Sequence, residues 1–323
     1  MLPQQSVVAV LEPGYTDYAP ERERLAPLGI SVLSVPADRD AVDNLKGRNV
    51  VALLVRERPC RKVVMDACPN LKAIVRYGVG VDNIDLAEAT ERKIYVANIP
   101  DYATSEVSDH AVALYLAVAR RIITRDAEVR RGLWGIGQGQ IIPGHRGATL
   151  GLIGFGRIAR ATWARFKALG FARALVTDPA LTPEAAVTLG VDIAPLDRIC
   201  AEADVLSLHA PLTDATRHLL DDSAIRLMKP TAILVNVGRG GLVDEQALAA
   251  ALNERRIFGA GIDVFEVEPP AQDNLLLSTP NTVVSDHTGW YSEASVRHLQ
   301  THAAEELVRV LSGETPLNWV NRW

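Results

Sequence analysis

The feature that most limits the fold is a regular alternation of short apolar runs with segments whose apolar residues recur at helical spacing. In the first hundred residues the apolar runs predict five strands, Val7–Leu11, Ser31–Val35, Val50–Val55, Ala73–Tyr77 and Ile94–Asn98. Segments such as Pro20–Leu28 and Lys62–Ala67 lie between these runs and predict helices. This alternation is typical of a parallel sheet with helices on both faces.

A second alternating series begins at Ala148. Its apolar runs predict six strands, Thr149–Ile153, Ala174–Thr177, Val205–Leu208, Ile233–Val237, Gly259–Ile262 and Thr282–Ser285. Between the two series we expect a long helix that begins near Thr104 or Ser105, with either hydroxyl as its cap and an apolar stripe within 110–123. The glycine-rich segment Arg131–Gly147 predicts an irregular connection between domains.

The last predicted helix, about Ser292–Leu311, is amphipathic, with Ala304, Leu307, Val308 and Leu311 on one side. A chain of 323 residues fits two domains better than one core. One long helix leads into the second series and another leads out, which predicts a discontinuous first domain. The expected boundaries are 1–103 with 291–323 for that domain and 104–290 for the other.

Composition excludes several classes of protein. The net charge is −5 and no stretch is densely basic, which argues against binding to nucleic acid. Cys60, Cys68 and Cys200 have no metal or redox spacing, so we expect reduced thiols and no metal site. The N-terminus lacks the features of a signal peptide, and no apolar run reaches the roughly 20 residues needed to cross a bilayer. A cytoplasmic protein is expected.

The strongest local motif is Gly-x-Gly-x-x-Ala, formed by Gly154, Gly156 and Ala159. It follows a predicted strand and opens the predicted helix Arg157–Leu169, which is the context that a dinucleotide-binding loop requires. Gly154 permits a tight turn, Gly156 lets a pyrophosphate approach the backbone, and the free amides of the helix attract phosphate. The alternative is a glycine-rich turn without a ligand.

The next predicted strand ends at Asp178, 24 positions after Gly154, near the distance expected for the carboxylate that binds a ribose diol. A carboxylate there repels a 2′-phosphate, and no arginine follows immediately to accept one. The sequence therefore favours NAD over NADP. The alternative, a turn-forming Asp-Pro pair, is compatible with the same role.

Further polar clusters follow strands of the second series, at the sheet edge where open parallel sheets bind ligands. The clusters are Ser207–Thr213, Val235–Glu245, Gly261–Pro270 and Ser285–Trp290. After the first cluster Thr213 or Asp214 can cap a helix, and in the second Asp244 caps the helix Glu245–Leu252. Taken singly, each cluster has an ordinary explanation as a turn, a solvated arginine or a structural histidine.

Three residues of these clusters supply complementary chemistry. Hydride transfer to a keto acid needs a cation for the carboxylate and carbonyl, a proton donor, and a carboxylate that orients the donor. Arg239, His287 and Glu268 supply one of each. We therefore predict an NAD-dependent oxidoreductase that transfers a hydride between the nicotinamide and C2 of a small 2-hydroxy or 2-keto acid.

From about Val7 to the C-terminus the chain resembles the D-isomer-specific 2-hydroxyacid dehydrogenases. The shared motifs are Gly-x-Gly-x-x-Ala with a later Asp, His-x-Pro-Leu-Thr, Asn-x-x-Arg-Gly-Gly-x-Val-Asp-Glu, Asp-Val-Phe-Glu-x-Glu-Pro and a late His-x-Gly. The resemblance implies a flavodoxin-like substrate domain and a Rossmann NAD-binding domain, both doubly wound parallel sheets, with the active site in a cleft between them. It also implies a homodimer built largely through the cofactor domains.

The resemblance also implies residue roles. It places the catalytic groups at Arg239, Glu268 and His287, and the substrate carboxylate at the amides of Val79 and Gly80, where a plain turn is the alternative. Trp290 would line the substrate pocket or only pack in the hinge. The resemblance places the cofactor against Gly154, Gly156, Arg157, Ile158, Asp178, His209, Pro211, Val237, Asp263 and Gly289, with Asp263 at the nicotinamide amide.

The sequence lies between branches of that family. The ending His287–Glu293 is most similar to the C-terminal binding proteins, whereas Arg56 resembles an arginine of phosphoglycerate dehydrogenases that helps bind phosphate. An NAD-sensing scaffold, a phosphoglycerate dehydrogenase-like activity and oxidation of a phosphorus oxyacid therefore stay open as alternatives. Two positions depart from the family pattern, because Asp286 stands where proline is usual and Gly238 where alanine or serine is usual.

Overall fold

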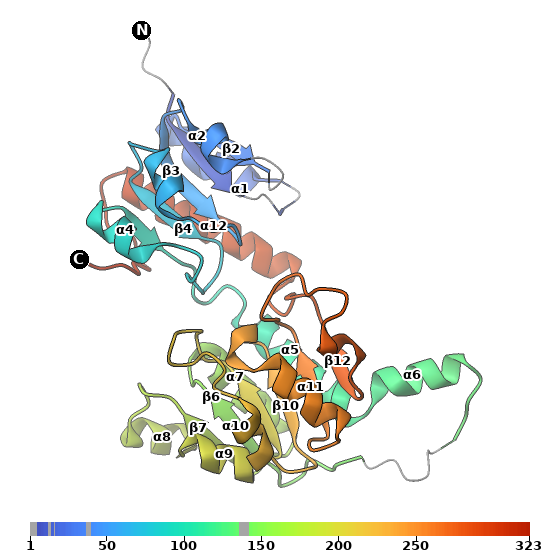
Figure 1. The fold of residues 1–323 in the computed structure, drawn as a ribbon. Helices are drawn as coiled ribbons and strands as arrows, with labels where there is room; N and C mark the ends of the chain where they lie inside the picture. Colours follow the sequence, from blue (N-terminus) through green and yellow to red (C-terminus); the bar gives the residue numbers. More distant parts are fainter. Residues whose placement is uncertain (1–4, 12–13, 16, 37–39, 136–141) are drawn as a thin grey trace. The chain divides into compact units, whose positions relative to one another are not determined.

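The computed structural model describes residues 1–323 except 1–4, 12–13, 16, 37–39 and 136–141. The chain divides into two compact units (Figure 1). The first unit contains Met1–Tyr102 and Ser292–Trp323, and the second contains Ala103–Tyr291. The first unit is therefore discontinuous, and each unit has its own sheet. The role of the first unit in substrate binding remains a prediction.

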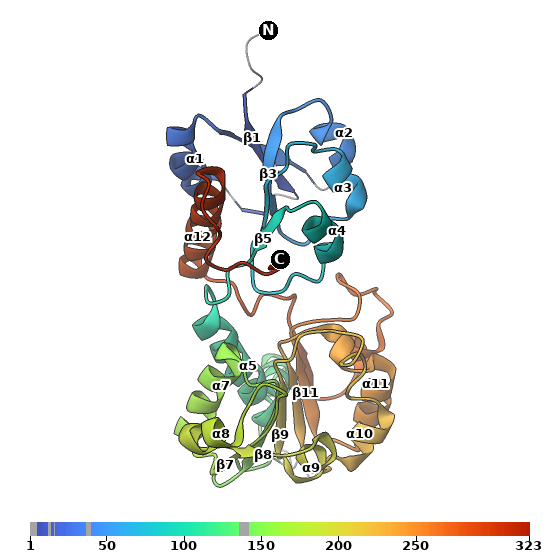
Figure 2. The same ribbon diagram turned by 90° about the vertical axis from the view of Figure 1, so that its left-hand side faces the viewer.

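The first unit contains a five-stranded parallel sheet with the order β2-β1-β3-β4-β5, which is the flavodoxin-like order. Its strands are β1 (Val7–Leu11), β2 (Ser31–Val35), β3 (Val50–Val55), β4 (Ala73–Arg76) and β5 (Tyr95–Ala97). Its helices are α1 (Ala19–Leu25), α2 (Ala41–Leu45), α3 (Lys62–Asp66), α4 (Leu86–Glu91) and α12 (Glu293–Leu311). Figure 2 shows α1 and α12 on one face of this sheet and α2, α3 and α4 on the other.

The second unit contains a seven-stranded parallel sheet with the order β12-β11-β10-β9-β6-β7-β8. Its strands are β6 (Thr149–Ile153), β7 (Arg173–Thr177), β8 (Asp192–Ile193), β9 (Val205–Leu208), β10 (Ile233–Asn236), β11 (Gly259–Ile262) and β12 (Thr282–Val284). The order of the chain reverses between β6 and β9, which is the switch point of a Rossmann sheet. The predicted class, two doubly wound parallel-sheet domains, is thereby confirmed.

Helices cover both faces of the second sheet. The helices of this unit are α5 (Thr104–Ala119), α6 (Ile122–Arg130), α7 (Arg157–Ala168), α8 (Pro183–Leu189), α9 (Leu196–Glu202), α10 (Asp222–Leu227) and α11 (Glu245–Asn253). Helix α6 has no buried residue and does not cover the sheet. One buried apolar cluster joins the sheet to α5, α7 and α8, and another joins it to α9, α10 and α11. Both faces of the sheet are thus buried, as parallel sheets require.

The strand predictions agree with the structure to within one or two residues because the central strands are buried on both faces and appear as continuous apolar runs. The strand β8 was not predicted, because it has only two residues, Asp192 and Ile193, and both are exposed. The predicted helix Pro20–Leu28 is divided into α1 and a 3₁₀ turn at Ala26–Leu28. Pro27 accounts for this division, since it has no N–H to donate within a helix.

Two expectations about the middle of the chain are wrong. Helix α5 has Ala103 at its N-cap, and Thr104 is already helical, so neither Thr104 nor Ser105 caps it. The segment Arg131–Gly147 does not connect domains, because both of its ends belong to the second unit. It follows α6 and leads to β6, and its residues 136–141 lie outside the described part of the chain.

Of the helix caps predicted from the sequence besides that of α5, the one at Asp244 is correct and the one at Thr213 or Asp214 is wrong. Asp244 accepts hydrogen bonds from the amides of Gln246 and Ala247 at the start of α11, as predicted. Ser292 caps α12, in which Ala304 and Leu307 are buried while Val308 and Leu311 are half-buried. Neither Thr213 nor Asp214 caps a helix, because the next helix begins at Asp222 and Asp221 is its cap.

Among the described residues, no helix is both long and apolar enough to cross a membrane. All three cysteines are free and buried. The cytoplasmic location remains a prediction.

Candidate active site

The glycine loop lies between β6 and α7 in the second unit. Gly154 has a φ of +84°, and a Cβ there would lie 2.8 Å from backbone atoms of His209 and Ala210. Its amide donates to the carbonyl of Thr177 at 2.9 Å. A side chain at this position would therefore collide with the neighbouring strand end. At Gly156, by contrast, a Cβ would meet open space, which leaves the backbone accessible to a ligand.

Asp178 is held against this loop at the end of β7. Its Oδ2 accepts a hydrogen bond from the amide of Phe155 at 2.6 Å, and its Oδ1 accepts one from the amide of Ala180 at 2.8 Å. The carboxylate is therefore fixed beside the predicted dinucleotide loop. Each oxygen retains a second lone pair that could accept a ribose hydroxyl.

The other predicted cofactor residues lie on the same edge of the sheet. Nε2 of His209 is 2.9 Å from Oγ of Ser207, and burial lowers the pKa of His209 to about 3. This histidine is therefore a neutral imidazole. Arg157 and Ile158 form the first turn of α7, where the free amides of the helix favour an anion. Pro211 follows β9 and Val237 follows β10.

These features fit a nicotinamide dinucleotide. The open backbone at Gly156 and the first turn of α7 would receive the pyrophosphate, and Asp178 would receive a ribose.

His287 and Glu268 form a close pair in the second unit. Nδ1 of His287 lies 2.6 Å from Oε2 of Glu268, and Oε1 of Glu268 accepts a hydrogen bond from the amide of Phe265 at 3.0 Å. Burial raises the pKa of Glu268, but the hydrogen bond and charge of His287, the Phe265 amide and the charge of Arg239 together lower it below its usual value. Glu268 is thus an ionised partner that orients the imidazole.

Arg239 follows β10, and a buried amide fixes its backbone. Asn236, which is only 1% exposed, donates from Nδ2 to the carbonyl of Arg239 at 2.9 Å and accepts at Oδ1 from the amide of Gly238 at 3.1 Å. Nη1 of Arg239 donates to the carbonyl of Gly238 at 2.9 Å. The strand ends of β10, β11 and β12 thereby position a guanidinium, a carboxylate and an imidazole in one unit.

Asp263 anchors the loop that contains His287. Asp263 is 2% exposed, its carbonyl accepts from the amide of His287, and its carboxylate accepts from the amides of Thr288 and Gly289. Ser285 and His110 also contact this carboxylate. The sequence did not single out these two residues, and the only available signal was that Ser285 is the last residue of a predicted strand.

The predicted substrate residues of the first unit lie in the loop between β4 and α4. Val79 is 42% exposed, and its carbonyl accepts a hydrogen bond from Nδ2 of Asn98 at 2.6 Å. Gly80 is half-buried. Because Val79 and Gly80 belong to the first unit and Arg239 to the second, their joint contact with one substrate remains a prediction.

Asp286 and Trp290 belong to the same loop as His287. Asp286 is exposed, and its Oδ1 accepts a hydrogen bond from Oγ1 of Thr288 at 2.9 Å. Trp290 is half-buried, and its ring lies edge-on to that of Tyr291 at 5.6 Å. The role of Trp290 as a pocket wall remains a prediction.

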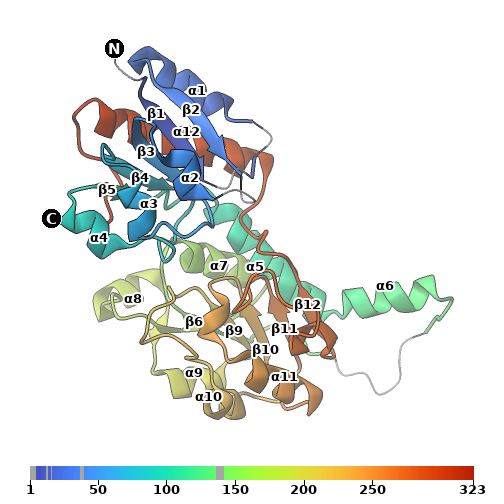
Figure 3. The ribbon, with the colours of Figure 1, turned by 45° about the horizontal axis from the view of Figure 1, so that its top comes forward.

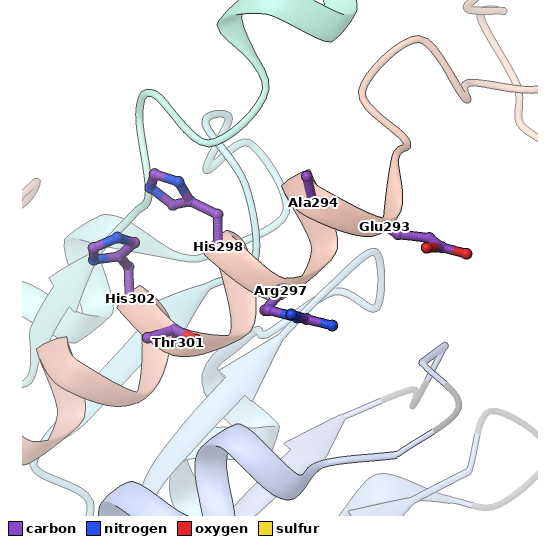
Figure 4. Close-up of a pocket in the computed structure, with 6 residues that line it drawn as sticks. All are labelled: Glu293, Ala294, Arg297, His298, Thr301 and His302. Atoms are coloured by element: carbon purple, nitrogen blue, oxygen red, sulfur yellow. The ribbon is translucent and has the colours of Figure 1, made fainter.

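A cavity of about 500 Å³ lies along the first turns of α12, and none of the predicted site residues lines it. Figure 4 shows His298 and His302 on one side of the helix and Glu293 and Arg297 on another. Ala294 and Thr301 complete the lining. Among the described residues there is no group of three or more histidine, cysteine or acidic side chains suited to a metal ion.

Comparison with known proteins decides the family. The sequence model described as D-isomer specific 2-hydroxyacid dehydrogenase, NAD binding domain, matches residues 112–289. The chain belongs to this family. It is an oxidoreductase of 2-hydroxy acids that uses a nicotinamide cofactor, and the matched residues include the glycine loop and the groups at 239, 268 and 287.

Relatives of this dehydrogenase include named enzymes. It is 39% identical to a glyoxylate reductase of Korarchaeum cryptofilum over 89% of this chain and 87% of that protein. It is 40% identical to a D-3-phosphoglycerate dehydrogenase of Methanocaldococcus jannaschii over 87% of this chain but only 53% of that protein.

Solved structures agree with this assignment. D-lactate dehydrogenase from Aquifex aeolicus, complexed with NAD and lactic acid, is 25% identical with a TM-score of 0.85, over 95% of this chain and 96% of that chain. The NADPH-dependent glyoxylate/hydroxypyruvate reductase of Sinorhizobium meliloti, in complex with NADP and malonate, is 29% identical with a TM-score of 0.83, over 98% and 97% of the two chains. The two neighbours hold different nicotinamide cofactors.

Proposed function

We propose that this dehydrogenase reduces small 2-keto acids to D-2-hydroxy acids with NADH, with glyoxylate as the first candidate substrate. The observation that supports this proposal is the 2.6 Å contact between His287 and an ionised Glu268. The charge of Arg239 also contributes to lowering the pKa of Glu268. Relatives named glyoxylate reductase support the choice of a small acid.

Each of the three groups has a distinct task. Arg239 binds the carboxylate of the acid and polarises its 2-carbonyl. His287 donates a proton to the carbonyl oxygen as it gains negative charge, and Glu268 holds the ring in the orientation that presents Nε2 to that oxygen. The bound nicotinamide supplies the hydride to C2. In the oxidation direction His287 accepts the proton from the hydroxyl group.

NAD is proposed over NADP. The carboxylate of Asp178 is fixed beside the glycine loop, where it would repel a 2′-phosphate. One solved neighbour holds NAD and another NADP, so chains of this fold differ in their cofactor. The fixed carboxylate of Asp178 is the feature that favours NAD in this chain.

The test is consumption of NADH, followed by its absorbance, with glyoxylate, hydroxypyruvate and pyruvate. We expect turnover of at least one acid by the wild type. His287→Asn should lower kcat by about 10²- to 10⁴-fold, because it removes the general acid, while NADH binding measured by fluorescence is kept. Unchanged turnover in His287→Asn would remove this residue from the mechanism.

Neither the NAD-sensing scaffold nor the phosphoglycerate dehydrogenase-like activity has better support than the reduction of a small keto acid. Tight NADH binding with negligible turnover of every acid would favour the scaffold. For a phosphorylated substrate the relevant group is Arg56, whose buried Nε has no hydrogen-bond partner among the described residues. The panel should therefore include 3-phosphohydroxypyruvate, and a preference for it that is lost in Arg56→Gln would favour a phosphoglycerate dehydrogenase-like activity.

We also propose a homodimer. Helix α6 extends away from the rest of the second unit (Figure 3). The helix and the residues after it expose large apolar side chains, namely Ile122, Ile123, Val129, Leu133 and Trp134, of which Trp134 is 91% exposed. We call these five residues the α6 patch. Apolar groups gathered on a protruding arm are typical of a protein–protein interface, and a second copy of this chain is the proposed partner.

A further inference from the structure

A chain of hydrogen bonds lies behind the His287 loop, and it begins on α5. Nε2 of His110 is 2.8 Å from Oγ of Ser285, and Oγ of Ser285 donates to Oδ1 of Asp263 at 2.6 Å. A serine hydroxyl has one proton, and here the carboxylate receives it. The oxygen of Ser285 must therefore accept a hydrogen bond from His110, so Nε2 of His110 is an N–H donor.

Asp263 connects this chain of hydrogen bonds to the backbone of the His287 loop. The amides of three successive residues donate to it: His287 to its carbonyl at 2.8 Å, Thr288 to Oδ1 at 3.1 Å and Gly289 to Oδ2 at 3.0 Å. His287 has a φ of +56°, a left-handed conformation that is unfavourable for residues other than glycine. The bonds to Asp263 hold His287 in that conformation.

The ring of His110 is also in direct contact with the loop. A Cβ at Gly289 would lie 2.8 Å from Oδ2 of Asp263 and 3.1 Å from Cδ2 of His110, so the loop backbone packs against both groups. His110 is 26% exposed at its side chain, whereas Asp263 is 3% exposed. A buried carboxylate is costly unless it is fully hydrogen-bonded, and His110 and Ser285 supply two of its partners.

The groups around Asp263 lower its pKa and so favour its ionised form. Burial raises the pKa of Asp263, but the hydrogen bonds from His110 and Ser285, the charge of His110 and the amide of Gly289 together lower it below its usual value. An anionic Asp263 is the stronger acceptor for the loop amides. Its Oδ2 accepts from Gly289 and retains a lone pair for the predicted contact with the nicotinamide amide.

We propose that His110 and Ser285 are positioning residues, which act through Asp263 to hold His287 in the orientation needed for proton transfer. This inference rests on the proposed reduction of keto acids by His287. Neither residue needs to touch the substrate or the cofactor. Their effect is to fix the backbone from 287 to 289, so that the imidazole is placed before the substrate arrives.

The test compares variants that differ in the donor at position 110. His110→Phe keeps a ring but removes the Nε2 donor, whereas His110→Gln can place an amide donor near the same point. We expect kcat for glyoxylate to fall about tenfold or more in His110→Phe, with the Kd for NADH within about twofold of the wild type, because a small misplacement of a catalytic group slows the chemical step. His110→Gln should recover most of that loss.

The serine is tested in the same way. Ser285→Ala should lower kcat as His110→Phe does, and Ser285→Thr, which keeps the hydroxyl, should restore it. Ser223→Ala, which removes an exposed hydroxyl at the start of α10, is the matched control and should leave kcat unchanged. All rates are expressed per NADH-binding site, so that loss of folded protein does not count as loss of catalysis.

The outcomes separate this inference from the proposed function. If the wild type reduces an acid but Ser285→Ala and a folded His110→Phe keep kcat within twofold, the positioning role is wrong and the function stands. The role is also wrong if Gln and Thr rescue nothing. If His110→Phe does not fold, the kcat values of Ser285→Ala and His110→Gln decide whether the positioning role holds. A wild type that binds NADH but reduces no acid contradicts the proposed function itself.

Discussion

At the scale of single residues, Asp178 combines two physical roles. It organises the glycine loop by accepting from the amide of Phe155, and it places a negative charge where a ribose of the cofactor is expected. The first role needs an acceptor oxygen, whereas the second needs a charge. A substitution that keeps the oxygen and removes the charge can therefore separate them.

Asp178→Asn is such a substitution. We expect the ratio of kcat/KM with NADH to kcat/KM with NADPH to fall by about tenfold or more, because the repulsion of the 2′-phosphate is lost while an acceptor for Phe155 is kept. Initial rates with both cofactors at saturating keto acid measure this ratio. An unchanged ratio would show that Asp178 does not select the cofactor.

At the scale of elements, a buried carboxylate joins three elements of the first unit. Glu21 on α1 is 0% exposed, and it accepts hydrogen bonds from Oη of Tyr77 after β4 at 2.5 Å and from Nε2 of Gln300 on α12 at 3.2 Å. Burial raises the pKa of Glu21, and these hydrogen bonds only partly oppose it. The contact between α1 and α12 should therefore depend on pH.

The sign follows from the raised pKa. Folding favours the protonated carboxyl, so this stabilisation is fully present below the ordinary pKa of 4.5 and is lost as the pH rises through the higher value of the folded state. Glu21→Gln mimics the neutral form. We expect the free energy of unfolding of the wild type to fall relative to that of Glu21→Gln as the pH rises above 4.5.

Urea unfolding of both proteins between pH 4.5 and pH 8 measures this difference. Glu23→Gln changes an exposed carboxylate of the same helix and serves as the control, for which little pH dependence is expected. A difference between the wild type and Glu21→Gln that is constant over this range would contradict the prediction.

At the scale of the whole molecule, each unit buries its own sheet, yet α6 contributes none of its residues to a core. The structure describes no buried residue in α6, and the α6 patch lies on this helix and on the residues after it. A helix that leaves its large apolar residues exposed normally gains stability from a partner. The homodimer would supply that partner.

Sedimentation should therefore give the mass of two 35.0 kDa chains for the wild type. Introducing charge into the patch with Ile123→Glu and Trp134→Glu should shift the equilibrium towards the monomer, because burying an unpaired carboxylate is costly. Val187→Glu, at an 82% exposed position on α8, is the control and should remain dimeric. A monomeric wild type at micromolar concentration would contradict the proposed dimer.

The sequence by itself determined the elements and much of the chemistry. Buried parallel strands are continuous apolar runs, so β1, β3, β6 and β9 could be located from the order of residues in the sequence. The glycine loop and the order of strand and helix around it depend on local backbone geometry, which a short motif specifies. Arg239, Glu268 and His287 were identified from the chemistry that a keto acid requires.

Only the tertiary structure decided which distant residues meet. His110 and Asp263 are 153 positions apart in the chain, and nothing local in either segment indicates that α5 packs beside the ends of β11 and β12. The burial of Glu21 and the exposure of the α6 patch likewise depend on which faces the other elements cover. Contacts of this kind arise from packing between elements, and no periodicity within one element specifies them.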